Sequence, residues 1–168
     1  MKKLWIFVIV FLVILCAAIW YIYSVLFPSP LSGNGVILEN PAAGLSIDEA
    51  VLVFNESFVF YLLANIGAYR LHSAPLSKEL PLIEIAVEGK TYSASIDGEI
   101  ILIGLGEILD EDIIIKTTKR EAVLMMNDKS YIFNSFNSGK SEIILVASKT
   151  ELAGKGYLSL YRDLRRKG

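Results

Sequence analysis

The pattern of apolar and polar positions divides the chain into two regions of unequal length. Leu4–Phe27 is an unbroken apolar run without charge, proline or glycine. At about 1.5 Å per residue this run makes a helix roughly 36 Å long, enough to cross the hydrocarbon core of a bilayer. Beyond it, apolar residues recur with the periods of helices and strands, which indicates a folded domain.

Three interpretations of Leu4–Phe27 compete: a retained single-pass helix, a cleaved secretory signal and a bacterial lipoprotein signal ending at Cys16. The run is longer than the apolar part of a cleaved signal, and no A-x-A-like site follows it. Leu15 stands where the lipoprotein motif requires a small residue. Length and flanks therefore favour the retained transmembrane helix.

The charges around this helix predict its orientation. Lys2 and Lys3 precede it, and no charged residue follows until Glu39. The positive-inside rule then keeps the amino terminus in the cytoplasm and places residues 28–168 outside the cell membrane. Pro28–Asn40 has the composition of a linker. We therefore expect an anchor over 1–27, a linker over 28–45 and a domain over 46–168.

A capping box opens the domain, with Ser46 at the cap and Glu49 three residues later. The pattern predicts one helix from there to Asn65 or Ile66, with Gly67 as its stop. Its second half, Phe58–Ala64, is apolar on all sides. Such a segment is a central core helix, lines an apolar cavity, or dips into the membrane face.

The period then changes to two, which predicts strands and tight turns, with Glu88-Gly89-Lys90 as the hairpin turn between the first two strands. The expected strands are Leu82–Val87, Thr91–Ile96, Glu99–Gly104, Asp112–Thr117 and Glu142–Ala147. Further helices are expected over Lys119–Asn127, capped by Thr117 or Thr118, over Lys129–Phe136 and over Thr150–Arg166, the last one firm from Tyr157. The predicted fold class is α+β, with about five mostly antiparallel strands covered by helices and preceded by one transmembrane helix.

Composition excludes several functions. Residues beyond the anchor carry 14 basic and 18 acidic side chains, a formal charge of −4, which argues against nucleic-acid binding. Cys16 is the only cysteine, so the domain has no disulfide and no thiolate metal site.

Catalytic and cofactor motifs are also missing. His72 is the only histidine, no G-x-S-x-G elbow accompanies it, and a structural loop histidine is expected. Asp110-Glu111-Asp112 lacks calcium-loop spacing and is interpreted as a solvated loop before a strand. Gly154-Lys155-Gly156 lacks the other residues of a phosphate loop. We predict no catalytic residue, cofactor or metal, and a non-enzymatic protein is favoured.

The carboxy-terminal half resembles the sterol-carrier-protein family over residues 82–166. The similarity consists of an acidic residue entering a D-x-x-I-x-T strand, a short helix, a phenylalanine–glycine turn and a strand of the G-K-x-x-I type. These features correspond to Glu111–Thr118, Ala122–Leu124, Phe136–Lys140 and Ile143–Leu145. The resemblance implies a five-stranded sheet covered by helices around an apolar tunnel that takes lipids or acyl chains.

Together these features predict a membrane-anchored, non-enzymatic domain that binds a lipid or another apolar ligand at the outer membrane face. Its expected partners are the bilayer and the ligand. The candidate ligand contacts are the large apolar and aromatic residues of the predicted helices: Phe58, Phe60, Tyr61, Leu62, Leu63, Phe136, Tyr157, Leu160 and Tyr161. The alternative is a membrane-tethered protein–protein interaction module without a ligand cavity.

Overall fold

The computed structural model describes residues 13–17, 38–75 and 77–165. Residues 13–17 are helical and belong to a unit spanning Met1–Val36, whereas Ile37–Gly168 forms a second compact unit. Within the described residues, none of the helices combines the length and apolarity needed to span a bilayer. Most of the predicted anchor lies outside the described residues, so the anchor stays a prediction.

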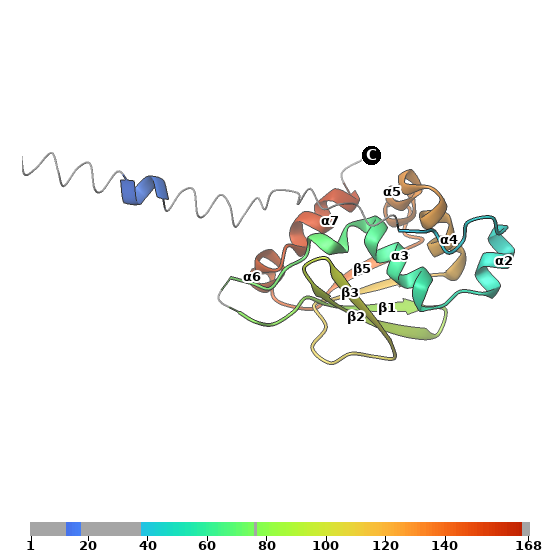
Figure 1. The fold of residues 1–168 in the computed structure, drawn as a ribbon, viewed down its shortest axis with the longest axis horizontal. Helices are drawn as coiled ribbons and strands as arrows, with labels where there is room; N and C mark the ends of the chain where they lie inside the picture. Colours follow the sequence, from blue (N-terminus) through green and yellow to red (C-terminus); the bar gives the residue numbers. More distant parts are fainter. Residues whose placement is uncertain (1–12, 18–37, 76, 166–168) are drawn as a thin grey trace, which may run out of the picture. The chain divides into compact units, whose positions relative to one another are not determined.

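The second unit contains helices before the first strand, between the last two strands and after the last strand (Figure 1). The helices are α2 (Ile47–Leu52), α3 (Glu56–Ile66), α4 (Lys119–Asn127), α5 (Lys129–Asn137), α6 (Lys149–Gly154) and α7 (Tyr157–Arg165), with a 3₁₀ turn η1 (Ala68–Arg70). The strands are β1 (Leu82–Val87), β2 (Lys90–Asp97), β3 (Ile100–Leu105), β4 (Ile113–Thr117) and β5 (Glu142–Leu145).

In the described part of the chain these strands form one five-stranded sheet in the order β3-β2-β1-β4-β5. The neighbours β1–β2, β2–β3 and β4–β5 are antiparallel, whereas β1 and β4 are parallel. The sheet is therefore mixed, although most neighbours are antiparallel as expected. The parallel pair arises because the chain returns along the sheet between β3 and β4 before it enters β4.

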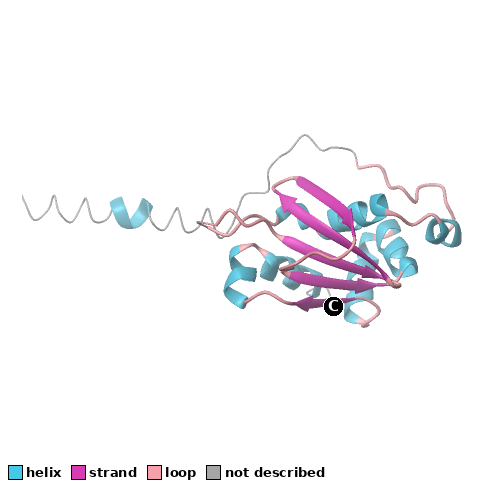
Figure 2. Ribbon diagram, turned by 90° about the horizontal axis from the view of Figure 1, so that it is seen from below, coloured by secondary structure: helices cyan, strands magenta, loops and turns pink. Residues whose placement is uncertain are grey.

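One face of the sheet carries the core. Alternate residues of β1 and β2 are buried, among them Ile85 and Tyr92, as the period-two pattern predicts. The helices cover this face, while the other face is seen without helices over it in Figure 2. Phe54 and Phe58 reach the sheet from the helix layer, with ring centroids 5.2 Å apart and Phe54 6.4 Å from Tyr92. Helix α3 is thus the central core helix that its apolar composition favoured.

Two predicted helices are each divided in two. The expected helix from Ile47 to Ile66 breaks after α2, because Asn55 takes an extended conformation and its side chain accepts a hydrogen bond from the Ser57 N–H to cap α3. The expected last helix breaks at Gly156, whose φ of 88° is left-handed and ends α6 before α7 begins. In both places a single uninterrupted helix was the wrong prediction.

The predicted caps and turns are largely confirmed. The capping box of Ser46 and Glu49 is present, and Gly67 ends α3 with a φ of 89°. Thr118 caps α4 by accepting the Glu121 N–H. Glu88 and Gly89 both have positive φ and form the turn between β1 and β2. These positions could be predicted because caps and tight turns depend on residues close in sequence.

Candidate functional site

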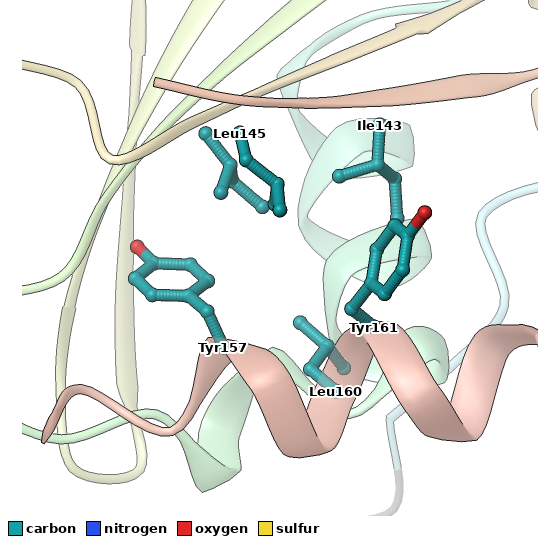
Figure 3. A pocket seen from close by; sticks show the side chains of 6 residues that line it. Ile143, Leu145, Tyr157, Leu160 and Tyr161 are labelled. Atoms are coloured by element: carbon teal, nitrogen blue, oxygen red, sulfur yellow. The ribbon is translucent and has the colours of Figure 1, made fainter. Parts of the chain in front are cut away.

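The candidate site is an apolar space between α7 and the β4–β5 end of the sheet (Figure 3). Tyr157, Leu160 and Tyr161 approach it from α7 and face Ile143 and Leu145 on β5. The lining is Ile113, Ile143, Leu145, Tyr157, Leu160 and Tyr161. The space measures about 170 Å³ out to the surface, and no part of it is wide enough for a water molecule. We call this space the seam, and the structure shows it in a closed state.

Register explains why these side chains meet. Ile113 pairs with Leu145 and Ile115 with Ile143 across β4 and β5, so all four side chains belong to the helix-covered face. On α7, Tyr157, Leu160 and Tyr161 lie three and four residues apart and share one face of the helix. Leu145 is still 38% exposed, whereas Leu160 is only 4% exposed. The seam is thus sealed on its inner side and incompletely covered at β5.

A buried polar cluster adjoins this seam at Tyr157, which belongs to both. Asp112 is fully buried, and its Oδ2 accepts hydrogen bonds from the Leu82 N–H at 2.7 Å and the Tyr157 hydroxyl at 3.0 Å. Its Oδ1 lies 2.7 Å from the Nζ of Lys155, which also contacts Glu151 at 3.0 Å. The cluster joins the starts of β1 and β4 to the α6–α7 corner. We call these residues, Asp112, Lys155, Tyr157 and Glu151, the buried ion cluster.

The protonation states of this cluster follow from its contacts. Burial lowers the pKa of Lys155, but the hydrogen bonds and charges of Asp112 and Glu151 outweigh burial and raise it above the ordinary 10.5. Burial, followed by the Asp112 charge and hydrogen bond, raises the pKa of the Tyr157 hydroxyl above 10.0. Lys155 is therefore a cation and Tyr157 a neutral donor at physiological pH. The hydrogen bonds of this cluster hold the start of β1, the start of β4 and the α6–α7 corner together.

The structure places the predicted ligand contacts in two groups. Tyr157, Leu160 and Tyr161 come together at the seam. Phe58, Leu62, Leu63 and Phe136 are buried in the core, and Phe60 and Tyr61 pack against it partly buried. The α3 residues and Phe136 do not line the space in Figure 3. A ligand role for any of these residues stays a prediction.

Sequence interpretation missed the buried ion cluster. Asp112 was expected in a solvated loop, yet it is fully buried, and this part of the prediction is wrong. Lys155 was considered only as part of a phosphate loop, although it is 3% exposed beside Asp112. The two residues are 43 positions apart, so no local pattern links them. The weak available signal was an aspartate directly before an apolar strand.

The remaining polar candidates are accounted for locally. The ring Nδ1 of His72 lies 3.0 Å from the Ser73 carbonyl oxygen. The backbone N–H of His72 donates a hydrogen bond to the Lys155 carbonyl oxygen. His72 thus connects its loop to the α6–α7 corner. In the described ranges, no group of three or more histidine, cysteine, aspartate or glutamate side chains is placed to hold a metal ion.

Comparisons with known proteins returned only solved structures. No protein-family model and no curated protein matches the chain. The chain is similar to a structure titled "UbiJ-SCP2 Ubiquinone synthesis protein", with 14% identity over 65% of this chain and 86% of that one, at a TM-score of 0.39.

Two further similar structures are SCP2-like proteins from Aedes aegypti. One is a solution structure of palmitated SCP2L2, with 16% identity over 63% of this chain and 93% of that one, at a TM-score of 0.38. The other is a crystal structure of Sterol Carrier Protein 2 Like 2, with 18% identity, coverages of 60% and 90%, and a TM-score of 0.34.

Proposed function

We propose that this protein is a membrane-anchored, non-enzymatic domain that binds an apolar ligand, such as a lipid acyl chain, between α7 and the β4–β5 end of the sheet. The observation that carries the proposal is the composition of the seam. Each of its six lining residues is aliphatic or aromatic, and the seam reaches the surface at Leu145. Ligand sites in proteins are concave and mostly apolar, with a few polar groups that fix orientation.

Binding requires the seam to widen. Sites for small molecules usually exceed about 300 Å³, which is more than the closed seam provides. Helix α7 is the element suited to move, because Gly156 separates it from α6 and it contributes three of the six lining residues. The buried ion cluster fixes the Tyr157 end of α7. Opening would therefore begin beyond Tyr157, near Leu160 and Tyr161.

The proposed location follows from the sequence. A helix over Leu4–Phe27 would keep the domain beside a supply of lipid, and Lys2 and Lys3 would orient it toward the outside. A single cysteine at the exposed Lys149, introduced as Lys149→Cys with Cys16→Ala, tests the orientation. On intact cells it should react with a membrane-impermeant thiol reagent. Reaction only after lysis would place the domain on the inner side.

Photo-crosslinking tests the ligand site. Membranes containing the full chain are incubated with a fatty acid that bears a diazirine and an alkyne, and adducts are mapped by mass spectrometry. We expect adducts in α7 and β5. Leu160→Trp should abolish them by filling the seam, whereas Leu158→Trp, at a 40% exposed position of the same helix, should leave them intact.

A second blocking variant is needed in case Leu160→Trp does not fold. Overpacking a buried position costs about 1–3 kcal/mol, so Leu160→Trp is checked by thermal unfolding. Leu145→Trp fills the mouth of the seam at a partly exposed position and is better tolerated. If adducts form only in the anchor region, or if both blocking variants label like the wild type, the seam is not a ligand site.

A further inference from the structure

The break between α2 and α3 contains a sequence motif that the proposed function does not use. Asn55-Glu56-Ser57 matches the acceptor motif for N-linked glycosylation, an asparagine followed two positions later by serine or threonine. None of the other asparagines in the sequence has serine or threonine at that position. A motif this short also arises by chance, so its surroundings in the folded protein decide its meaning.

The fold presents this motif at the surface. Its three residues are exposed, whereas Phe54 and Phe58 on either side are buried. Asn55 lies between α2 and α3 in an extended conformation, with a φ of −148° and a ψ of −168°. The continuous helix expected from the sequence would have placed the motif within a helix. The observed break gives it the surface position in which glycan acceptors occur.

The hydrogen bonding of Asn55 leaves its reactive atom free. The Oδ1 accepts the Ser57 N–H at 2.9 Å and so caps α3. The Nδ2, to which the sugar is joined in N-linked glycosylation, has no hydrogen-bond acceptor among the described residues. A glycosylated asparagine keeps its Oδ1, so the cap and a glycan can be present together.

Helix capping alone does not require this pair of residues. The helices α2, α4, α5 and α6 are capped by serine, threonine or aspartate, at Ser46, Thr118, Asp128 and Ser148. The cap of α3 uses only the backbone N–H of Ser57, and the Ser57 hydroxyl forms no hydrogen bond within the described part of the chain. The Asn55 amide nitrogen and the Ser57 hydroxyl are therefore not needed for the cap, yet both are needed in a glycan acceptor.

The surface directly before the motif is apolar. Leu52 is 83% exposed and Val53 is 53% exposed. A glycan on Asn55 would be attached two residues after Val53, beside these side chains. N-linked glycans are bulky and solubilising. A glycan at this position would therefore shield two apolar side chains from contact with other molecules.

We propose that Asn55 is the acceptor of an N-linked oligosaccharide. The donor is an oligosaccharide carried on a polyprenyl phosphate or diphosphate, and a membrane-bound oligosaccharyltransferase catalyses the transfer. A bond forms between the Asn55 Nδ2 and C1 of the first sugar, while the bond between C1 and the phosphate oxygen breaks and this oxygen keeps the electron pair. The Nδ2 loses one of its two protons. The proposal rests on the proposed location of the domain, because the transfer takes place on the side of the membrane that faces away from the cytoplasm.

Translation of the full chain with microsomal membranes tests the proposal. These membranes contain the transferase, and glycosylation is seen as a loss of gel mobility that an endoglycosidase reverses. We expect one shifted band for the wild type. Asn55→Asp should abolish the shift, because aspartate caps a helix as well as asparagine does but has no amide nitrogen. Ser57→Ala should also abolish the shift and leave the cap in place, whereas Ser57→Thr should keep both.

A second acceptor in the same domain separates this proposal from the proposed location. Ser148→Asn, combined with Asn55→Asp, creates the motif with Lys149 and Thr150 at another exposed helix cap, and it should restore the shift. A shift in this variant but not in the wild type would overturn the assignment of Asn55 and leave the location intact. The absence of a shift in both would overturn both proposals. A wild-type shift that persists in Asn55→Asp would place the sugar on another residue.

Mass spectrometry of the full chain from its own membranes tests the same residue without substitution. Cleavage after glutamate releases residues 50–56, in which Asn55 is the only asparagine. We expect this peptide to carry the additional mass of an oligosaccharide. Complete recovery of the unmodified peptide would overturn the proposal.

Discussion

The two ends of the sheet are finished in opposite ways. At the β5 end, α7 packs over the apolar seam, and the buried ion cluster connects β1, β4 and the α6–α7 corner. At the β3 end, exposed apolar side chains and outward backbone groups meet no partner strand in the described part of the chain. The comparison indicates one end that is fixed at the buried ion cluster and another that lacks such a constraint.

The buried ion cluster explains the fixed end. Asp112, directly before β4, connects three segments of the chain, because it accepts hydrogen bonds from the Leu82 N–H at the start of β1 and from the Lys155 Nζ and the Tyr157 hydroxyl at the α6–α7 corner. A buried charge is tolerated only where its hydrogen bonds are made, so these three segments have little freedom to shift. No comparable constraint holds β3, whose exposed side chains are all apolar.

The largest expected effect comes from Asp112→Asn. The substitution removes the carboxylate while leaving Lys155 buried with Glu151 as its remaining anion, and we expect the free energy of unfolding to fall by about 3–5 kcal/mol. Asp48→Asn is the matched control, because the Arg120–Asp48 ion pair is 60% and 85% exposed. It should cost less than about 1 kcal/mol. Thermal and urea unfolding of both variants measures the difference. If both variants lost the same free energy of unfolding, the buried ion pair would contribute no more than the exposed one, which would contradict the prediction.

Sequence patterns predicted the elements of this domain better than their connections. Strands β1 and β4, the Thr118 cap and the Gly67 stop depend on residues within a few positions of one another, and all appear near their expected places. The mixed sheet was not predicted, because the parallel pairing of β1 with β4 depends on where the chain travels after β3. Nothing in the local period of β4 indicates its direction.

The candidate site shows the same division. Tyr157, Leu160 and Tyr161 were identified because they are large apolar and aromatic residues of a predicted helix, and they do meet at the seam. Asp112 and Lys155 were missed because their roles exist only once residues 43 positions apart are brought together. The edge position of β3 likewise depends on sheet order. Its apolar sequence alone does not distinguish an edge strand from a central one.

Alkaline pH should destabilise the protein through Tyr157 of the buried ion cluster. The pKa of Tyr157 is raised in the folded protein, so above pH 10 the unfolded chain loses this proton while the folded chain keeps it. Stability should therefore fall with rising pH, with Tyr157 contributing a slope of about 1.4 kcal/mol per pH unit. Tyr157→Phe should remove that contribution.

Tyr157→Phe should also destabilise the protein at neutral pH. Losing the hydrogen bond to the buried Asp112 carboxylate should lower stability by about 1.5–3 kcal/mol at pH 7. The pKa of Lys155 is raised in the folded protein. The stability that charged Lys155 contributes is therefore fully present below pH 10.5 and is lost only as the pH rises further. Urea unfolding between pH 7 and 11 measures both effects, and an unchanged alkaline slope in Tyr157→Phe would contradict the assigned cause.

A smaller effect is expected on the open face of the sheet. Burial, followed by the charges of Glu111 and Glu107, raises the pKa of Glu84 above 4.5, against a hydrogen bond from the Ile108 backbone. The folded state thus holds the Glu84 proton more tightly, so its stability should fall as pH rises above 4.5. Glu84→Gln should remove this dependence and stabilise the protein at pH 7 by less than about 1 kcal/mol. Glu79→Gln, in an exposed loop, serves as the control for urea unfolding between pH 4 and 7.

The smallest expected effect tests whether the β3 end is truly uncovered. Leu102 is 61% exposed, whereas its neighbour Ile101 is 8% exposed on the helix-covered face. Leu102→Ser should change the free energy of unfolding by no more than about 0.5 kcal/mol, as for an ordinary surface substitution. Ile101→Ala, one residue away on the same strand, should cost about 2–5 kcal/mol because it leaves a cavity in the core. Thermal unfolding of the two variants measures the alternation directly. A loss above about 1 kcal/mol for Leu102→Ser would mean that the folded protein covers the exposed face of β3, and the two ends of the sheet would then be alike.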